Sequence, residues 1–173
     1  AYDHADHQDE YLPARQAAEK ALVLDDHLSE AHEAMSWVCS SLEMRIREGE
    51  PFMRRAYELA PNDSSIVGSM ALWEMILGNF DRAIRLSKKS IELDPLNPFA
   101  HRELGRILLF AGRLDEARES MMRALDMSTD MTTIHLGLCL CAVLQGNFEE
   151  AFRTIEKEKL PGYRYCGQAI ASF

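Results

Sequence analysis

Apolar and polar residues alternate with a helical period along most of this chain. In "DRAIRLSKKSIEL" and "DEARESMMRALDM", apolar residues return every three or four positions, which places them on one face of a helix. Breaks that contain proline, such as "LDPLNP" and "LAPND", separate these stretches. "TTIHLGLCLCAVLQ" is apolar almost all round, so it predicts a helix that is buried on several sides or covered by a partner. The pattern predicts an all-α chain of short helices.

The helical pattern also repeats at a fixed interval. Gly78, Gly112 and Gly146 stand 34 residues apart, and each is followed by a large apolar residue, an acid and, five positions on, an alanine. Glycine adopts the left-handed conformation that ends many helices, and an acid suits the first turn of the next helix. The sequence therefore predicts a repeating unit made of one helix, a tight turn and a second helix.

These residues resemble the tetratricopeptide repeat, a helix–turn–helix unit of about 34 residues. The unit that begins at Pro98 has the residue types of the family pattern at Leu104, Gly105, Ala117, Met121 and Ala124. The resemblance implies an all-α, right-handed superhelical solenoid of antiparallel helix pairs. In such a solenoid neighbouring units stack, because one unit cannot bury its apolar face alone.

The resemblance divides 1–173 into successive units of a single solenoid. Partial repeats are expected at 1–28 and 162–173, and full repeats at about 29–63, 64–97, 98–131 and 132–161. The repeat 29–63 is one residue longer than the family pattern, and the comparison of units places this extra residue in "MRIREGEPF".

A binding site follows from the same resemblance. In the family, the first helix of each unit lines a concave face that binds an extended peptide or a partner helix. The positions that point to this face, carried over residue by residue, are Trp37, Leu72, Met75, Ile76, Phe99, Arg102, Arg106, Leu109, Phe110, Leu136, Leu140 and Val143. This lining is mostly apolar toward the C-terminus, with two arginines in its middle.

Those two arginines allow two interpretations. Arg102 and Arg106 are four residues apart, which puts them on one face of a helix. Their guanidinium groups could bind a carboxylate of the partner in a bidentate manner. Alternatively, they pair with Glu103, Glu116 or another neighbouring acid. One subfamily grips the C-terminal carboxylate of chaperone peptides with lysines and asparagines, and the first helices expected here contain neither.

The charge balance bears on the kind of partner. The chain has 28 acidic and 19 basic residues, a formal charge of −9. Nucleic acids and anionic lipid surfaces bind through cationic contacts, so we expect this segment to contact neither. The four cysteines follow no CxxC spacing, and the acidic start of the chain does not have the pattern of a signal peptide. Both features favour reduced thiols in a cytoplasmic protein.

The common sequence motifs of catalysis are absent from the chain. The sequence contains no glycine-rich phosphate loop, no GxSxG and no HExxH. His135 and Cys139 are four residues apart and could form half of a metal site, but two ligands do not make a site, and a half-buried pair in packing is the favoured interpretation. His4 and His7 lie in the acidic opening "DHADHQDE", which is typical of a solvated terminus. We therefore expect no enzymatic activity, no cofactor and no metal.

Two functions agree with these observations. The first is a non-catalytic protein–protein interaction scaffold that binds a peptide or partner helix in its concave groove. The second is a regulatory or self-association segment of a larger bacterial signalling protein, because "ARQAAEKALVLDD" and "LPGYRYCGQAIASF" are similar to the C-terminal repeat arrays of class III nucleotide cyclases and winged-helix regulators. The absence of an initiating Met, and an end inside an expected helix, predict a piece of a longer polypeptide.

Overall fold

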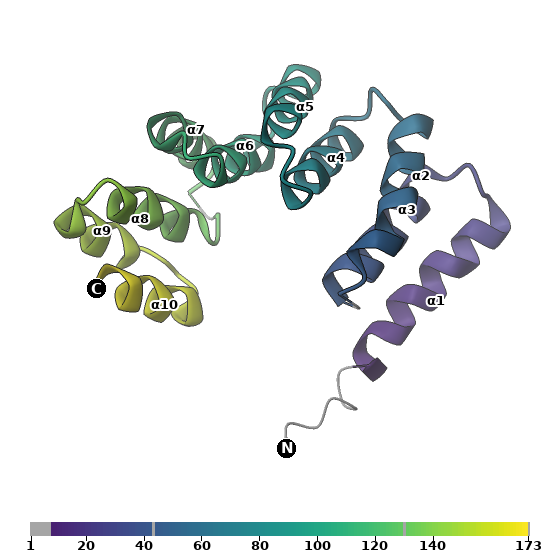
Figure 1. Cartoon of the computed structure of the whole chain (residues 1–173), viewed down its shortest axis with the longest axis horizontal. Coiled ribbons are helices and arrows are strands. Elements are labelled where there is room, and N and C mark those ends of the chain that lie inside the picture. The colour runs from purple at the N-terminus through teal and green to yellow at the C-terminus, as the bar shows by residue number, and fades with distance from the viewer. Residues whose placement is uncertain (1–7, 43, 130, 173) are drawn as a thin grey trace.

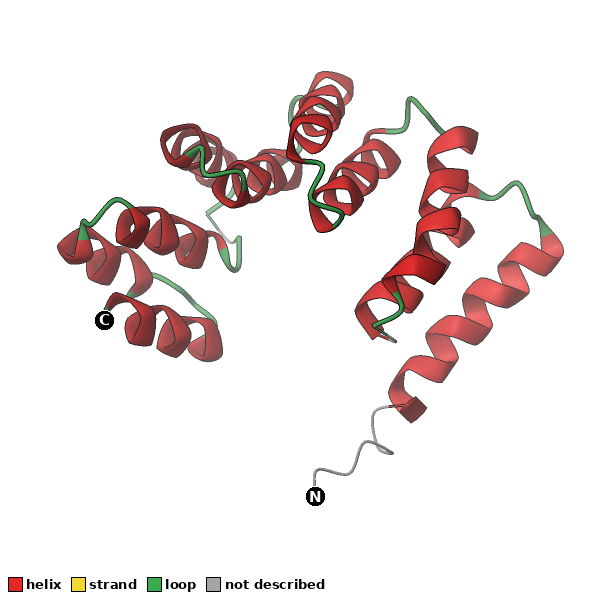
Figure 2. Cartoon of the chain, viewed as in Figure 1, coloured by secondary structure: helices red, strands yellow, loops and turns green. Residues whose placement is uncertain are grey.

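The structure is a computed structural model that describes residues 8–42, 44–129 and 131–172. Within these ranges the chain forms ten α-helices and one π-helical turn, with no β-strand (Figure 2). The helices are α1 Gln8–Leu24, α2 Ser29–Trp37, α3 Ile46–Leu59, α4 Ser64–Ile76, α5 Phe80–Leu93, α6 Pro98–Phe110, α7 Leu114–Met127, α8 Ile134–Leu144, α9 Phe148–Ile155 and α10 Pro161–Ala171.

The helices pack in pairs that follow one another along an arch (Figure 1). The pairs are α2 with α3, α4 with α5, α6 with α7 and α8 with α9, while α10 packs on both α8 and α9. Figure 1 shows α4, α6 and α8 on the inner side of the arch, and α5, α7 and α9 on its outer side. The predicted all-α solenoid is therefore confirmed.

Left-handed glycines join the two helices of three pairs. The φ angles of Gly78, Gly112 and Gly146 are +80°, +75° and +76°, as the repeated glycine predicts. After Gly78, the backbone N–H of Asn79 donates to the carbonyl of Glu74 at 2.8 Å, the bond that closes a Schellman turn. The same turn therefore recurs in the chain every 34 residues.

Small residues let the two helices of a pair approach closely. Ala83, Ala117 and Ala151, five positions after each turn glycine, are fully buried. Gly105 on α6 faces α7 so closely that an added Cβ would lie 2.5 Å from Met121 Cγ. The main core runs without interruption from α3 to α8, and a smaller cluster lies among α8, α9 and α10. Stacking of successive pairs thus provides the core, as expected for a repeat array.

The long first repeat departs from the regular pattern. The extra residue was expected in "MRIREGEPF", but the irregularity lies earlier, in a π-helical turn at Val38–Leu42 that directly follows α2. The i→i+5 bonds of a π-helix take up one more residue per turn than an α-helix does. Gly49 on α3 packs tightly here, since an added Cβ would lie 2.6 Å from Trp73 Cη2.

The entry into α8 is a second irregularity. Thr133 has a φ of +68° and precedes α8, which begins at Ile134. The carboxylate of Glu158 is 1% exposed and accepts the backbone N–H groups of Thr133 at 3.4 Å and Leu160 at 3.3 Å. A left-handed threonine costs conformational energy. Both contacts to Glu158 Oε1 are longer than typical hydrogen bonds, and they connect the turn before α8 to the end of α9.

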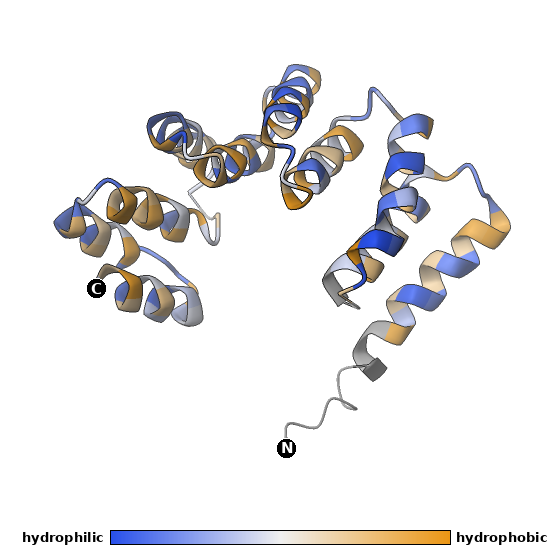
Figure 3. Ribbon diagram, in the orientation of Figure 1, coloured by the Kyte–Doolittle hydropathy of each residue, from blue (hydrophilic) through white to orange (hydrophobic). Residues whose placement is uncertain are grey.

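Hydropathy follows the same architecture. Orange colour, which marks hydrophobic residues, runs along much of α8, whereas α5 on the outer side carries much more blue (Figure 3). Among the described residues, no helix combines the length and the apolar character needed to cross a bilayer.

Candidate functional site

A cavity of about 260 Å³ lies between α6, α8 and α10 and has six of the predicted site residues in its lining. We call it the α6–α8–α10 cavity. Its predicted members are Arg102, Arg106, Leu109, Phe110, Leu136 and Leu140. Four of these six side chains are apolar, and Phe110 is 62% exposed. The cavity is therefore an apolar hollow with charged groups at one side.

Six residues that line this cavity were not predicted, and two of them, Tyr163 and Met121, show why. Tyr163 on α10 is 45% exposed, and it would have been found if the position rule had been applied to the partial repeat 162–173. Met121 comes from α7 on the outer side, which the rule does not consider. It reaches the cavity because Gly137 has no side chain, and an added Cβ there would lie 2.7 Å from Met121 Cε.

The two arginines share one acidic partner. Arg102 donates from Nε at 2.9 Å and from Nη2 at 2.6 Å to Glu103 Oε1, and Arg106 Nη2 lies 2.7 Å from Glu103 Oε2. The Arg102 guanidinium also lies 5.1 Å from the centre of the Phe99 ring. We call Arg102, Glu103 and Arg106 the arginine cluster. Pairing with Glu103 is thus the arrangement observed.

The other acid considered for this pairing has a different partner. Glu116 accepts hydrogen bonds from Arg113, with Nη2 2.6 Å from Oε2. This hydrogen bond lowers the pKa of Glu116 and raises that of Arg113. Both side chains lie near the beginning of α7, away from the arginine cluster.

A second cavity of about 220 Å³ lies between α4, α5 and α6, and we call it the α4–α6 cavity. It contains the predicted residues Leu72, Phe99 and Arg102. The rest of its lining is small and polar, with several serines and Asn97. Arg102 and Glu103 line both cavities, so the two cavities adjoin at the arginine cluster.

Four predicted residues line neither cavity. Trp37 packs edge-on against Trp73, with ring centres 5.7 Å apart, and is half-buried. Met75 packs against the main core and Val143 against the smaller cluster. Ile76 is 41% exposed, at the end of α4. These side chains mainly contribute to packing, apart from Ile76.

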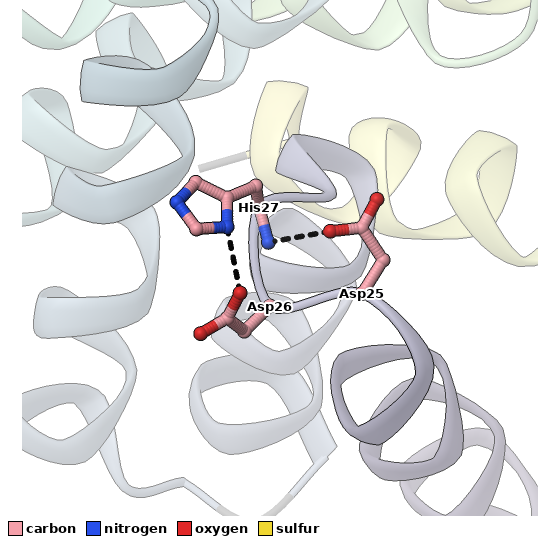
Figure 4. A group of neighbouring side chains, drawn as sticks. All are labelled: Asp25, Asp26 and His27. Carbon is pink, nitrogen blue, oxygen red and sulfur yellow. Dashed lines mark hydrogen bonds and ion pairs between the residues drawn. The ribbon is translucent and has the colours of Figure 1, made fainter.

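The loop between α1 and α2 contains a group that resembles a cation site (Figure 4). In residues 8–42, 44–129 and 131–172, Asp25, Asp26 and His27 are the one group of three potential ligands close together. The backbone N–H of His27 donates to Asp25 Oδ1 at 2.9 Å, and its Nδ1 lies 2.6 Å from Asp26 Oδ1. All three are exposed, and these contacts are those of an ordinary polar turn.

The suggested pair of His135 and Cys139 is arranged for packing. Burial lowers the pKa of His135 and raises the pKa of Cys139, so both are held in their neutral forms. The Cys139 thiol faces the carbonyl of Gly167, with Sγ 3.9 Å from the oxygen. A metal binds the thiolate, which this environment disfavours. His4 and His7 lie outside the described residues.

Stacked helix pairs, left-handed glycine turns and cavities between inner helices define a helical-repeat solenoid. The model of the family described as "Tetratricopeptide repeat" matches residues 75–126. A curated relative, Tetratricopeptide repeat-containing protein trd-1 of Caenorhabditis elegans, is 31% identical over 105 residues, which is 60% of this chain and 13% of the relative. Residues 75–126 therefore match the tetratricopeptide repeat family, and the chain has the helical-repeat fold of solved proteins of that description. It spans about an eighth of the length of that relative.

Solved structures show the same fold. The crystal structure of a thermophilic tetratricopeptide repeat protein of Thermus thermophilus aligns with a TM-score of 0.80 and 17% identity, covering 96% of this chain and 93% of that one. YrrB, described as a tetratricopeptide repeat protein with an unusual peptide-binding site, aligns with a TM-score of 0.63 and 18% identity, covering 95% and 82%. At these identities the likeness concerns the fold alone.

Proposed function

We propose that the chain is a non-catalytic interaction scaffold that binds a peptide or a partner helix along the inner helices α4, α6 and α8. The main support is that the two cavities adjoin on this side and share Arg102 and Glu103. Phe99 and Phe110 stand at opposite ends of α6 and are 57% and 62% exposed. Large aromatic side chains left in water beside a cavity are typical anchors of protein interfaces.

The lining of the cavities also supports binding over catalysis. Among the described residues that line them, serines occur without a histidine, and the charged groups are those of the arginine cluster. A nucleophilic serine requires a neighbouring base. YrrB, which has the same fold, is described as binding a peptide. We extend the proposal to a protein partner, since a net charge of −9 disfavours nucleic acid and anionic lipid, and to the cytoplasm, since the cysteine spacing favours reduced thiols.

The proposal is tested by comparing inner and outer aromatic residues. The double variant Phe99→Ser and Phe110→Ser changes the inner side, and the control Phe152→Ser changes α9, where the side chain is 39% exposed. Proteins captured from a lysate are compared for the three forms after each has been shown to fold by circular dichroism. We expect partners that the wild type and the control bind and the double variant does not. Equal capture by all three would contradict binding along the inner side.

Self-association is a second candidate, favoured by exposed apolar residues at the end of α1. Val23 is 85% exposed and Leu24 is 78% exposed, side by side on one helix. Burying both against a second copy would remove apolar surface from water. Sedimentation velocity over a wide concentration range tests this. A sedimentation coefficient that is concentration-dependent in the wild type but not in Val23→Ser/Leu24→Ser would support it, and a constant value in the wild type would exclude it.

A further inference from the structure

The arginine cluster has one positive charge more than its own acid can neutralise. Two guanidinium groups share the single carboxylate of Glu103. In the described part of the chain, no other charged residue lines the α6–α8–α10 cavity. The local charge is thus about +1 in a chain whose formal charge is −9. A local excess of the opposite sign to the whole molecule indicates an anionic ligand group at this position.

The arginines are positioned to bind such a group without rearrangement. Each guanidinium has five N–H donors, more than one shared carboxylate can accept. Glu103 holds both from the side, and the side chain of Arg106 remains 46% exposed. The Phe99 ring gives the Arg102 guanidinium a second contact, 5.1 Å from its centre. The ordering cost of two long side chains is therefore largely met before a ligand arrives.

The apolar part of the same cavity sets a second requirement. Leu109, Phe110, Leu136, Leu140 and Tyr163 form walls beside the arginines. A volume of about 260 Å³ holds one large side chain and is too small for a whole helix. A ligand that fills the cavity must therefore place a large apolar group next to its anionic group.

We infer that the α6–α8–α10 cavity and the arginine cluster bind an internal segment of a protein partner in which an acidic residue stands beside a large apolar residue. The apolar side chain fills the cavity, and the carboxylate binds to Arg102 and Arg106. This inference rests on the proposed scaffold function and adds the chemistry of the partner.

An internal segment fits better than a chain end because the surface continues beyond the arginines. The α4–α6 cavity begins at Arg102 and Glu103, and its polar lining includes the exposed Ser65 and the half-buried Ser64, whose hydroxyls can pair with polar backbone groups. A partner that fills both cavities passes over the arginine cluster instead of ending there. The charge also fits a carboxylate better than a phosphate, because a dianion next to Glu103 exceeds the single positive charge available.

The experiment selects binders for the whole 173-residue chain from random dodecapeptides displayed inside a surface loop of a carrier protein, so that no peptide has a free end. We expect enrichment of Asp or Glu adjacent to Phe, Leu, Met or Trp. A selected peptide is then synthesised with both ends blocked, in three forms: unchanged, with its acid changed to the amide, and with its apolar residue changed to Ala. Binding is measured by fluorescence anisotropy.

Variants on exposed residues link the peptide to the site. Arg106→Gln weakens the binding of the acidic peptide by about tenfold and does not change the binding of the amide peptide. The amide peptide has no carboxylate, so it has no charge-assisted contact with Arg106 to lose. Phe110→Ala weakens the unchanged peptide more than the peptide that already carries Ala. Arg123→Gln on α7, where the arginine pairs with Glu119, is the matched control and has no effect.

The outcomes separate this inference from the proposed function. Two outcomes would refute the carboxylate site and still support the scaffold. In the first, selected peptides bind in a Phe110-dependent manner but contain no acid. In the second, the acidic peptide and its amide form bind equally well. A tighter complex with peptides that end in a free carboxylate at the apolar residue would refute the internal segment. If Phe99→Ser/Phe110→Ser and Arg106→Gln leave the binding of all selected peptides intact, the inner-side scaffold itself is wrong.

Discussion

Asn79 donates two hydrogen bonds to Glu74, one from its backbone N–H to the Glu74 carbonyl and one from Nδ2 to the carboxylate Oε2, both at 2.8 Å. Glu74 is fully buried on α4, and Arg82 Nε on α5 lies 3.2 Å from its other oxygen. A buried carboxylate is stable only when its oxygens have partners. Glu74 therefore links the end of α4, the turn after Gly78 and the first turn of α5.

Replacement of this carboxylate should loosen the turn. We expect Glu74→Ala to lower the free energy of unfolding by about 2 kcal/mol, because hydrogen bonds to a buried charge are lost. Glu92→Ala on the exposed side of α5 is the control and should change it by less than about 0.5 kcal/mol. Urea unfolding followed by circular dichroism measures both. Equal effects of the two substitutions would show that the buried bonds contribute nothing specific.

The contact between α6 and α7 depends on the absence of a side chain at Gly105. An added Cβ would lie 2.5 Å from Met121 Cγ and 3.1 Å from the carbonyl oxygen of Ala117. We expect Gly105→Ala to destabilise the chain by about 1–3 kcal/mol, the usual cost of overpacking, despite the better helix propensity of alanine.

Gly162→Ala on α10 is the control for this prediction, because nothing lies within 4 Å of an added Cβ there. It should be neutral or slightly stabilising, since alanine favours the helix. Thermal unfolding compares the two variants. A Gly105→Ala protein as stable as the control would mean that Met121 repacks freely and that the close approach of α6 and α7 is not required.

The sequence was sufficient to predict the fold because the repeat is local. Gly78, Gly112 and Gly146 each set a turn through their own backbone conformation, which does not depend on distant parts of the chain. The alanines five positions later pack against the helix just before them. Such short-range rules recur every 34 residues and hence can be read from the spacing alone.

The features that the repeat pattern did not predict depend on contacts between residues that are distant in the sequence. The π-helical turn at Val38–Leu42 depends on how α2 and α3 pack around Gly49 and Trp73, and the spacing shows only that one residue is extra. The position rule predicts Trp37 in the groove, whereas the ring packs on Trp73 from the next repeat. Met121 reaches the candidate site through the space left by Gly137. In each case a contact between neighbouring repeats determines the outcome, and the sequence of a single repeat does not indicate that contact.

The four thiols should differ strongly in reactivity. Cys166 on α10 is exposed, whereas Cys39, Cys139 and Cys141 are buried. Disulfide-exchange reagents attack accessible thiolates. We expect one equivalent of thiol to react with Ellman's reagent within minutes in the native protein at neutral pH, and four after unfolding in guanidinium. Cys166→Ser should abolish the fast phase. A fast phase that persists in this variant would show that a second thiol is accessible in the native state.

Cys141 should make the fold sensitive to alkaline pH. Burial raises the pKa of this thiol from 9.0 to about 11, so the unfolded chain releases the proton at lower pH than the folded chain does. The stabilising contribution of the neutral thiol is complete below pH 9 and decreases as the pH rises toward 11. We therefore expect the free energy of unfolding to fall more steeply between pH 9 and 11 in the wild type than in Cys141→Ala.

The comparison of slopes isolates the thiol from other alkaline titrations. The other groups, among them the buried Cys139, whose pKa is also raised, are present in both proteins and cancel in the difference. Cys141→Ala also removes a buried sulfur atom and lowers stability at every pH, so the level of the curve is uninformative and only its slope counts. Urea unfolding at intervals from pH 7 to 11 gives both slopes. Parallel curves would mean that the fold tolerates the Cys141 thiolate. Water that enters between α7 and α8 could stabilise it, and so could the nearby guanidinium of Arg118, whose charge favours the thiolate.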